Sequence, residues 1–356
     1  MISLWLVRGG SHGEHESKFI EENRVFLTWG ELTATDMTLI SDYDGIRARL
    51  SQFYPNEPVR RVGNWSGQIW AFIVGIKEGD WLVMPRKRQS TIAIGQVVSS
   101  CKFDASAAND YRHYREVRWL NTEIPRSNFD QDILFSFGAF LTVCEIRRND
   151  AEVRVRAMAA NNWQATSASV IRASAASSPA TNGQVQEVDA INDEPEVDLE
   201  ELARDSIAKL IIRKFKGHGM ARLVDAILRA QGFTTYLSPA GPDKGIDILA
   251  GSGAFGFMNP KICVQVKSGD TPADHLEFTH LIGAMQSVQA DYGLFVSWSD
   301  FKQSVNKEEA AKFFKVRLWN QNDLIEQLLV NYDRLDQSIQ AEIPLKRIWL
   351  VAAQND

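Results

Sequence analysis

The sequence predicts a protein of two domains, a small β-barrel at residues 1–155 and a mixed α/β domain at residues 201–356. Its 356 residues exceed the usual single-domain size of about 100–200 residues. The first part has short strand patterns between Gly and Pro turns, whereas the last part alternates strand and helix patterns. Residues 156–200 between them are rich in Ala, Ser, Asn and acid, which predicts a flexible acidic linker with little apolar surface to bury.

In the first domain, runs of β-branched and aromatic residues predict six strands, and two further segments predict helices. The strands are expected at Ser3–Val7, Val25–Trp29, Trp81–Pro85, Ile92–Val98, Val117–Leu120 and Phe140–Ile146, and the helices at Arg47–Phe53 and Gly67–Val74. Many short strands joined by tight turns are typical of a small β-barrel with helical insertions.

The second domain starts with a helical pattern and then mixes strands with helices. Helices are expected at Met220–Ala230, Leu276–Gln289, Lys307–Phe314 and Asp323–Leu329, and strands at Thr234–Leu237, Ile246–Ala250, Lys261–Lys267, Gly293–Ser297 and Lys315–Leu318. The connection from Lys267 to Gly293 is long enough for a crossover helix, so part of the sheet should be parallel.

The net charge of −6 is concentrated in one region. Lys+Arg and Asp+Glu balance at 20 against 20 in residues 1–160 and at 17 against 17 in residues 205–356, while residues 161–204 hold 2 against 8. The linker region therefore carries the whole acidic excess, and the net charge does not exclude a nucleic-acid partner.

The sequence pattern predicts neither a membrane span nor a signal peptide. No apolar run approaches the roughly 18 residues of a membrane span, and the opening Met1–Val7 is too short for a signal peptide. Three isolated cysteines, Cys101, Cys144 and Cys263, argue against a disulfide framework and against a Cys-rich zinc site. We expect a cytoplasmic protein.

Three polar side chains converge on two neighbouring strands of the second domain. Gln265 and Lys267 share one face of their strand, and pairing with the strand that begins near Asp247 would bring that acid beside them. Asp247 is an oxygen donor of the hard type that Mg²⁺ prefers, and Lys267 is a compact positive charge suited to a phosphate. In isolation, Gln265 and Lys267 would fit a solvated strand face, but their convergence with Asp247 favours a site.

With these residues in place, the segment from about His218 to Leu329 resembles the Mrr catalytic domain of the PD-(D/E)xK nuclease superfamily, which carries an acid in a G-x-D turn and then a Gln-x-Lys strand. The resemblance implies a restriction-endonuclease-like mixed sheet flanked by helices and Mg²⁺-dependent cleavage of double-stranded DNA, with Mn²⁺ as a substitute. It makes Asp247 a metal ligand, places Gln265 where the superfamily has a second acid, and makes Lys267 the catalytic lysine.

Four residues around this motif are candidate DNA contacts. Asp243 and Lys244 lie in the turn before Asp247, and Asp243 has the alternative role of a simple turn former in Pro-Asp-x-Gly. Ser297 and Lys302 follow the Gly293 strand, where a loop could meet phosphate.

The sequence departs from the family on the first helix. Mrr domains usually carry a metal-binding glutamate there, and this chain has Ala221 at the matching position. Asp225 lies one helical turn further, about 6 Å along the axis, and is a candidate replacement ligand for the metal. The alternative is that Asp225 is an ordinary helix residue.

A glycine-rich segment between the two strands imitates a nucleotide-binding motif. Gly251–Gly256 matches G-x-G-x-x-G, but a helix should follow that motif and the sequence instead continues into a strand. We therefore expect a hairpin and no nucleotide cofactor.

In the first domain, Asn64–Trp70, Ile76–Pro85 and Ile92–Val97 resemble the PUA-like barrels, which include the EVE and YTH readers of modified bases. Such readers take one base into an aromatic pocket, where stacking contributes about 1–3 kcal/mol. Trp29, Asn64 and Trp65 are the candidates for that modified-base pocket.

Together these features predict a restriction-type DNA endonuclease directed at foreign or modified DNA, similar to type IV systems, whose first domain selects the target. Cutting both strands needs two sites, which predicts a homodimer. One alternative is a structure-selective repair or recombination nuclease. The other is a modified-nucleic-acid binding protein whose nuclease domain has lost activity.

Overall fold

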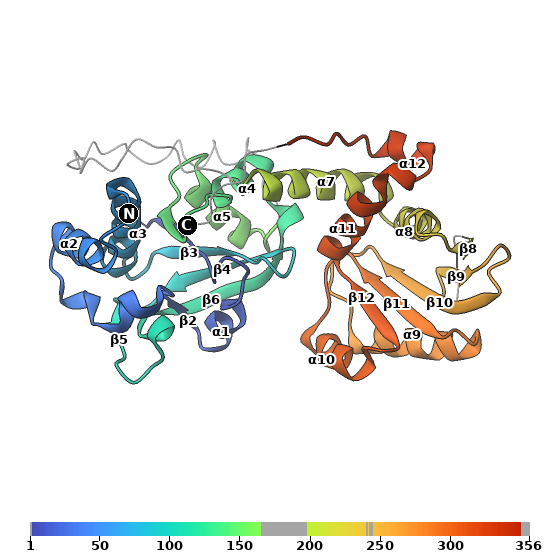
Figure 1. Ribbon diagram of the computed structural model, residues 1–356, viewed down its shortest axis with the longest axis horizontal. Helices are drawn as coiled ribbons and strands as arrows, with labels where there is room; N and C mark the ends of the chain where they lie inside the picture. Colours follow the sequence, from blue (N-terminus) through green and yellow to red (C-terminus); the bar gives the residue numbers. More distant parts are fainter. Residues whose placement is uncertain (1, 165–197, 240, 242–244, 350–356) are drawn as a thin grey trace. The chain divides into compact units, whose positions relative to one another are not determined.

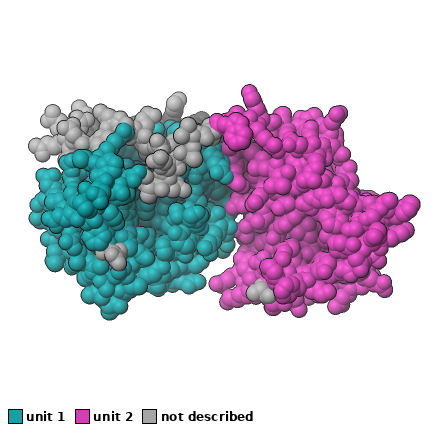
Figure 2. All heavy atoms as spheres, in the orientation of Figure 1, with its two compact units in different colours: residues 1–202 teal, residues 203–356 magenta. Residues whose placement is uncertain are grey.

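The computed structural model describes residues 2–164, 198–239, 241 and 245–349, in two compact units. The first unit is Met1–Leu202 and the second unit is Ala203–Asp356, coloured separately in Figure 2. Most of the predicted linker, residues 165–197, lies outside the described residues. Residues 156–160 were assigned wrongly to it, because helix α5 (Ala151–Ala160) continues through them and buries Met158 in the core.

The first unit is built on a seven-stranded sheet with the order β2-β6-β4-β3-β1-β7, and β5 pairs with β6. Figure 1 labels β2 to β6 of this sheet. Their bounds are β1 Leu4–Val7, β2 Arg24–Phe26, β3 Trp81–Pro85, β4 Thr91–Val97, β5 Lys102–Phe103, β6 His113–Pro125 and β7 Val143–Glu145. Only β1 and β3 run parallel among these described pairs. The predicted strand-rich domain is present, although no described pairing closes the sheet between β2 and β7.

Helical segments cover both faces of this sheet. They are α1 Glu16–Glu21, α2 Tyr43–Phe53, α3 Val59–Trp70, a π-helix at Ala71–Gly75, α4 Gln131–Phe137 and α5, with short 3-10 turns at Gly30–Ala34, Met37–Leu39, Asn109–Tyr111 and Arg126–Asn128. Alternate residues of β1 enter different cores, because successive strand side chains point to opposite faces. Trp5 and Val7 join the core with α1 to α3, while Leu4 and Leu6 join the core with α4 and α5.

The second unit has a five-stranded mixed sheet with the order β12-β11-β10-β9-β8. The bounds are β8 Thr234–Leu237, β9 Ile248–Ser252, β10 Met258–Lys267, β11 Tyr292–Ser297 and β12 Val316–Trp319. Strands β10, β11 and β12 are parallel, and β9 is antiparallel to both β10 and β8. This confirms the predicted mixed sheet and the crossover, which is helix α9 (His275–Ser287).

Two separate cores lie on the two faces of this sheet, and Figure 1 shows α8 and α9 on opposite sides of the strands. The remaining helical segments are α7 Leu199–Phe215, α8 His218–Ala230, α10 Gln303–Lys312, α11 Gln321–Asn331, a 3-10 turn at Tyr332–Arg334 and α12 Gln337–Glu342. Val264 packs with α7, α8 and α11, whereas the neighbouring Cys263 packs with α9. By the alternation of a strand, Gln265 and Lys267 belong to the α9 face.

The glycine-rich segment is a hairpin, as predicted. Met258 pairs with Ser252 across the turn, and β10 follows directly without a helix. A Cβ on Gly251 would lie 2.0 Å from the carbonyl oxygen of Gly256, so only glycine fits at that position. Within the ranges that the structure describes, no helix is both long and apolar enough to cross a membrane.

Candidate active site

Asp247 lies directly before β9 and is held by the neighbouring strand β10. Its backbone N–H donates to the carbonyl oxygen of Val264 at 3.0 Å, and its carboxylate Oδ2 accepts from the N–H of Val266 at 2.8 Å. These two partners flank Gln265 in the sequence. The hydrogen bonds therefore fix the Asp247 carboxylate alongside the Gln265 position.

Gln265 is 3% exposed, and its Oε1 is buried without a hydrogen-bond partner among the described residues. A buried polar atom left unpaired costs about 1–3 kcal/mol, so this oxygen needs an explanation. Carboxylate and amide oxygens are hard donors of the kind that Mg²⁺ prefers, and Mg²⁺ commonly uses only one or two carboxylates together with water and substrate phosphate. The unpaired oxygen beside Asp247 therefore fits a divalent metal ion.

The described residues contain no group of three or more His, Cys, Asp or Glu side chains that could hold a metal ion. Cys263, on the same face of β10, is fully buried, and burial together with the negative charge of Asp247 raises the pKa of its thiol to about 11. A thiol with such a pKa stays protonated and is a poor metal ligand at neutral pH. Among the described residues of β10 and the start of β9, the oxygen atoms of Asp247 and Gln265 are therefore the candidate donors.

Lys267 ends β10, and its Nζ lies 3.2 Å from Oε1 of Glu277 on α9. Glu277 is not among the site residues predicted from the sequence. Its signal was present as the pattern Asp274-x-x-Glu277 before an apolar run, which is a capping box. The structure contains that box, because the Asp274 side chain accepts from the N–H of Glu277, and Oε2 of Glu277 accepts from the N–H of Asp274 at 3.1 Å.

Asp225 does not join this group in the structure. It lies on α8, which packs on the sheet face opposite to α9, and it is 5% exposed. Its Oδ2 accepts from Nε of Arg229 at 3.0 Å, and Arg229 also pairs with Asp336 at 2.8 Å. The structure therefore does not support Asp225 as a replacement metal ligand, because α8 lies on the sheet face opposite to α9 and one Asp225 oxygen pairs with Arg229.

The predicted DNA contacts have different outcomes. Ser297 is 1% exposed and its hydroxyl donates to the carbonyl oxygen of Asp300 at 2.6 Å, which gives it a role inside the loop and corrects its assignment as a DNA contact. Lys302 is exposed, with Nζ 3.8 Å from Asp274 Oδ2, and it stays a candidate. Asp243 and Lys244 lie outside the described residues.

In the first unit, the structure brings Trp29 and Trp65 together although they are far apart in sequence. Their ring centroids are 6.1 Å apart at 89°, and Tyr54 contacts Trp65 from another side at 5.1 Å. Rings that meet edge to face leave no slot between them, so Trp29 and Trp65 can form one wall of a pocket but not two opposite walls. Asn64 is exposed, and its Oδ1 accepts from Nε2 of Gln68 at 2.7 Å.

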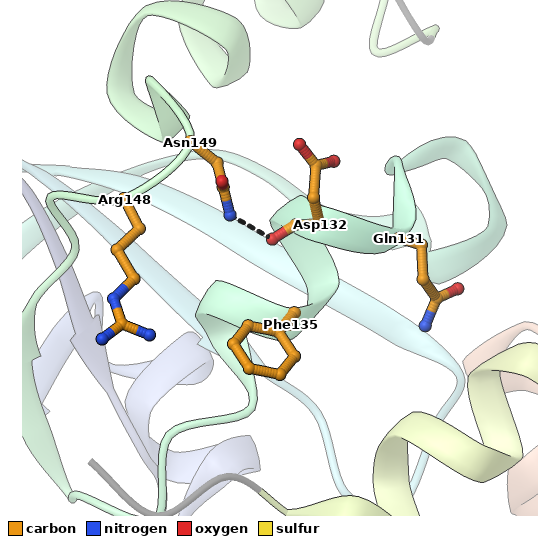
Figure 3. Close-up of a pocket in the computed structure, with 5 residues that line it drawn as sticks. All are labelled: Gln131, Asp132, Phe135, Arg148 and Asn149. Carbon is orange, nitrogen blue, oxygen red and sulfur yellow. Dashed lines mark hydrogen bonds between the residues drawn. The ribbon is translucent and has the colours of Figure 1, made fainter. Parts of the chain in front are cut away.

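A surface pocket of about 720 Å³ lies elsewhere in the first unit (Figure 3). It is lined by Gln131, Asp132, Phe135, Arg148 and Asn149. Asn149 donates from its amide to the Asp132 carbonyl oxygen at 2.8 Å, which ties the two sides of the pocket together. None of the three predicted base-pocket residues lines it.

Residues 212–328 match the family model of a restriction endonuclease domain, Mrr_cat, and this range contains the Asp247, Gln265 and Lys267 group. Residues 5–135 match a domain of unknown function, DUF8426. No curated protein sequence matches the chain.

Three solved structures are similar to the chain. The DNA modification-dependent restriction endonuclease AspBHI has 13% sequence identity, covers 81% of this chain and 74% of its own, and has a TM-score of 0.33. The MspJI restriction endonuclease in complex with a 27-mer oligonucleotide has 12% identity, covers 90% of this chain and 73% of its own, and has a TM-score of 0.31. The protein of unknown function AF1548 has 14% identity, covers 38% and 79%, and has a TM-score of 0.24.

Proposed function

We propose that the second unit, whose residues 212–328 match the Mrr_cat family model of a restriction endonuclease, hydrolyses phosphodiester bonds of double-stranded DNA with a divalent metal ion, Mg²⁺ or Mn²⁺. Asp247 and Gln265 would hold the metal ion through their oxygens, and Lys267 would contact the phosphate. The observation that carries the proposal is the buried Oε1 of Gln265, which has no hydrogen-bond partner among the described residues and lies beside the fixed carboxylate of Asp247.

The proposed reaction divides its requirements between the metal ion and a few side chains. When bound, the metal ion supplies positive charge for the phosphate and lowers the pKa of a coordinated water. The chain itself fixes one carboxylate through the N–H of Val266 and offers one amide oxygen. It also presents a partly exposed ammonium group at the end of the same strand, in a position to stabilise the extra charge of the transition state.

We further propose that the first unit selects foreign or modified DNA, in the manner of a type IV restriction system. Its contact of Trp29 and Trp65, both only partly buried, supports this as an aromatic surface on which a base could stack. Hydrolysis of both strands calls for two active sites, so the enzyme should act as a homodimer on DNA.

A substrate panel tests these proposals. The full chain is incubated with Mg²⁺ or Mn²⁺ and with unmodified, base-modified and branched duplexes, with the Lys267→Ala variant as the control for contaminating nucleases. Cleavage confined to modified duplexes is expected. Cleavage confined to branched DNA would instead assign a repair or recombination nuclease, and binding without cleavage under every condition would assign a reader whose nuclease domain is inactive.

A further inference from the structure

A lysine at the end of a strand has a positioning problem. Its ammonium group sits on four flexible carbons, and the backbone of β10 fixes only the first of them. A catalytic group has to be held within about 0.5 Å of its working position, which requires neighbours that lock its side chain. Something beyond β10 must therefore hold Nζ of Lys267.

Glu277 has the geometry for this task. Its Oε1 lies 3.2 Å from Nζ of Lys267, and both side chains are partly exposed on the α9 side of the sheet. Its own position is fixed, because it is the third residue of α9 and its Oε2 accepts from the N–H of Asp274 in the capping box. A rigid carboxylate thus faces a flexible ammonium group.

We propose that Glu277 is the positioning residue of Lys267 in the cleavage reaction, an inference that rests on the proposed function. Both of its oxygens are engaged, one by the helix terminus and one by the lysine. Its role is therefore to hold the ammonium group where it meets the phosphate. Ala221 on α8 has no carboxylate, and Gln265 is neutral. Glu277 is the acid that contacts Lys267 from α9.

The test variant is Glu277→Gln, which keeps an oxygen to accept from Asp274 and so preserves the capping box, but removes the charge that pairs with Lys267. Single-turnover cleavage should slow about 10-fold to 100-fold, since small displacements of a catalytic group have effects of this size. The DNA concentration and the Mg²⁺ concentration at half-maximal rate should stay within about twofold of wild type, because neither ligand contacts Glu277 in this proposal.

The matched control is Asp323→Asn, which makes the same change at the same position of a second capping box, on α11. It has no lysine partner in the described contacts, and it should cleave at the wild-type rate. A loss of activity in Asp323→Asn equal to that in Glu277→Gln would reduce Glu277 to a helix-capping residue.

Two further measurements separate the possible roles. Adding Glu277→Gln to Lys267→Met should not lower the residual cleavage further, whereas a direct metal ligand would lower it and raise the Mg²⁺ requirement. In the metal-free protein, the ammonium ¹H–¹⁵N signal of Lys267, assigned by its loss in Lys267→Met, should broaden or vanish in Glu277→Gln. Wild-type cleavage with an unaffected Glu277→Gln variant overturns the inference alone, and a wild type that cuts no DNA overturns the proposed function as well.

Discussion

The two sheets each bury a large polar side chain, and they treat it in opposite ways. Arg115 on β6 is 2% exposed and donates to three backbone carbonyl oxygens, those of Phe72, Ile73 and Ser99, at 2.7, 2.8 and 3.2 Å. Gln265 on β10 is 3% exposed, and its Oε1 has no partner in the described part of the structure. The buried arginine completes the fold, whereas the buried glutamine leaves an oxygen available next to an acid.

This difference separates a polar group that completes the fold from one that we propose to hold a metal ion. Arg115 donates hydrogen bonds to backbone carbonyl oxygens, two of them in the π-helix. Buried carbonyl oxygens need such donors, so the arginine stabilises the folded first unit. Gln265 Oε1 gains no such hydrogen bond from the described residues. A buried oxygen without a partner lowers the stability of the fold, so its presence calls for an explanation such as a role in binding.

The largest effect is expected from Asp247→Asn. The amide oxygen can still accept from the N–H of Val266, so the strand contact survives while the negative charge is lost. Cleavage should fall by about 1000-fold, in the range found when one electrostatic element of a site is removed. The thermal midpoint should remain near that of wild type, and a variant that cuts DNA normally would remove Asp247 from the proposed metal site.

A large effect on stability, without any direct effect on the chemistry, is expected from Arg115→Ala. Truncation leaves three carbonyl oxygens without their donors, and we expect the free energy of unfolding of the first unit to fall by about 3 kcal/mol. Urea unfolding followed by tryptophan fluorescence reports mainly on this unit, which holds seven of the ten tryptophans. Arg118→Ala, an exposed arginine on the same strand, is the control and should change little.

The pH dependence of the first unit should depend on His113. Its side chain is fully buried, its Nε2 accepts from the N–H of Met37 at 2.9 Å, and burial lowers its pKa to about 4. The unfolded chain takes up a proton below about pH 6.5 and the folded chain does not, so this stability is complete above pH 6.5 and is lost as the pH falls to about 4. Between pH 7 and pH 5 we expect a loss of about 2 kcal/mol.

The variant His113→Gln tests that assignment, because it can still accept from Met37 but cannot be protonated. The difference in unfolding free energy between wild type and variant should shrink by about 2 kcal/mol from pH 7 to pH 5. Parallel curves for the two proteins would show that His113 titrates at an ordinary pH, and that its burial in the first unit is not maintained in solution.

Much of the fold could be predicted because the strands have strong local patterns. The predicted Thr234–Leu237 and Trp81–Pro85 coincide with β8 and β3, where runs rich in β-branched, aromatic or apolar residues are bounded by turns. The strand order of the first sheet could not be predicted in the same way, because it depends on pairings between distant segments such as β1 and β3. The predicted start of the linker was wrong for a related reason. Met158 is buried in a core of the first unit, and this burial does not follow from the weak apolar pattern of its own segment.

In the candidate site, too, local features could be predicted from the sequence and tertiary ones could not. The shared face of Gln265 and Lys267 could be predicted because side chains alternate along a strand, while their role in the site stays a prediction. Glu277 and Asp225 could not be sorted by sequence, since that requires knowing which helix covers which face of the sheet. Trp29 and Trp65 were correctly brought together as a pair, but their edge-to-face angle depends on packing with Tyr54 and is not encoded in spacing.

The smallest effect is expected from Asp225→Asn, and it tests the comparison most directly, because Oδ1 of Asp225 is also buried without a hydrogen-bond partner among the described residues. Two facts distinguish it from Gln265. Its other oxygen is paired with Arg229, and α8 lies on the face away from Lys267. Asparagine at position 225 keeps the size of the side chain and can accept from Arg229. Only the ion pair is weakened, which should lower the free energy of unfolding by about 0.2–1 kcal/mol for a partly exposed pair. The Mg²⁺ concentration for half-maximal cleavage should therefore equal that of wild type. If it rose several-fold, Asp225 would supply the carboxylate missing at Ala221, and the sheet face would no longer separate structural from functional groups in this domain.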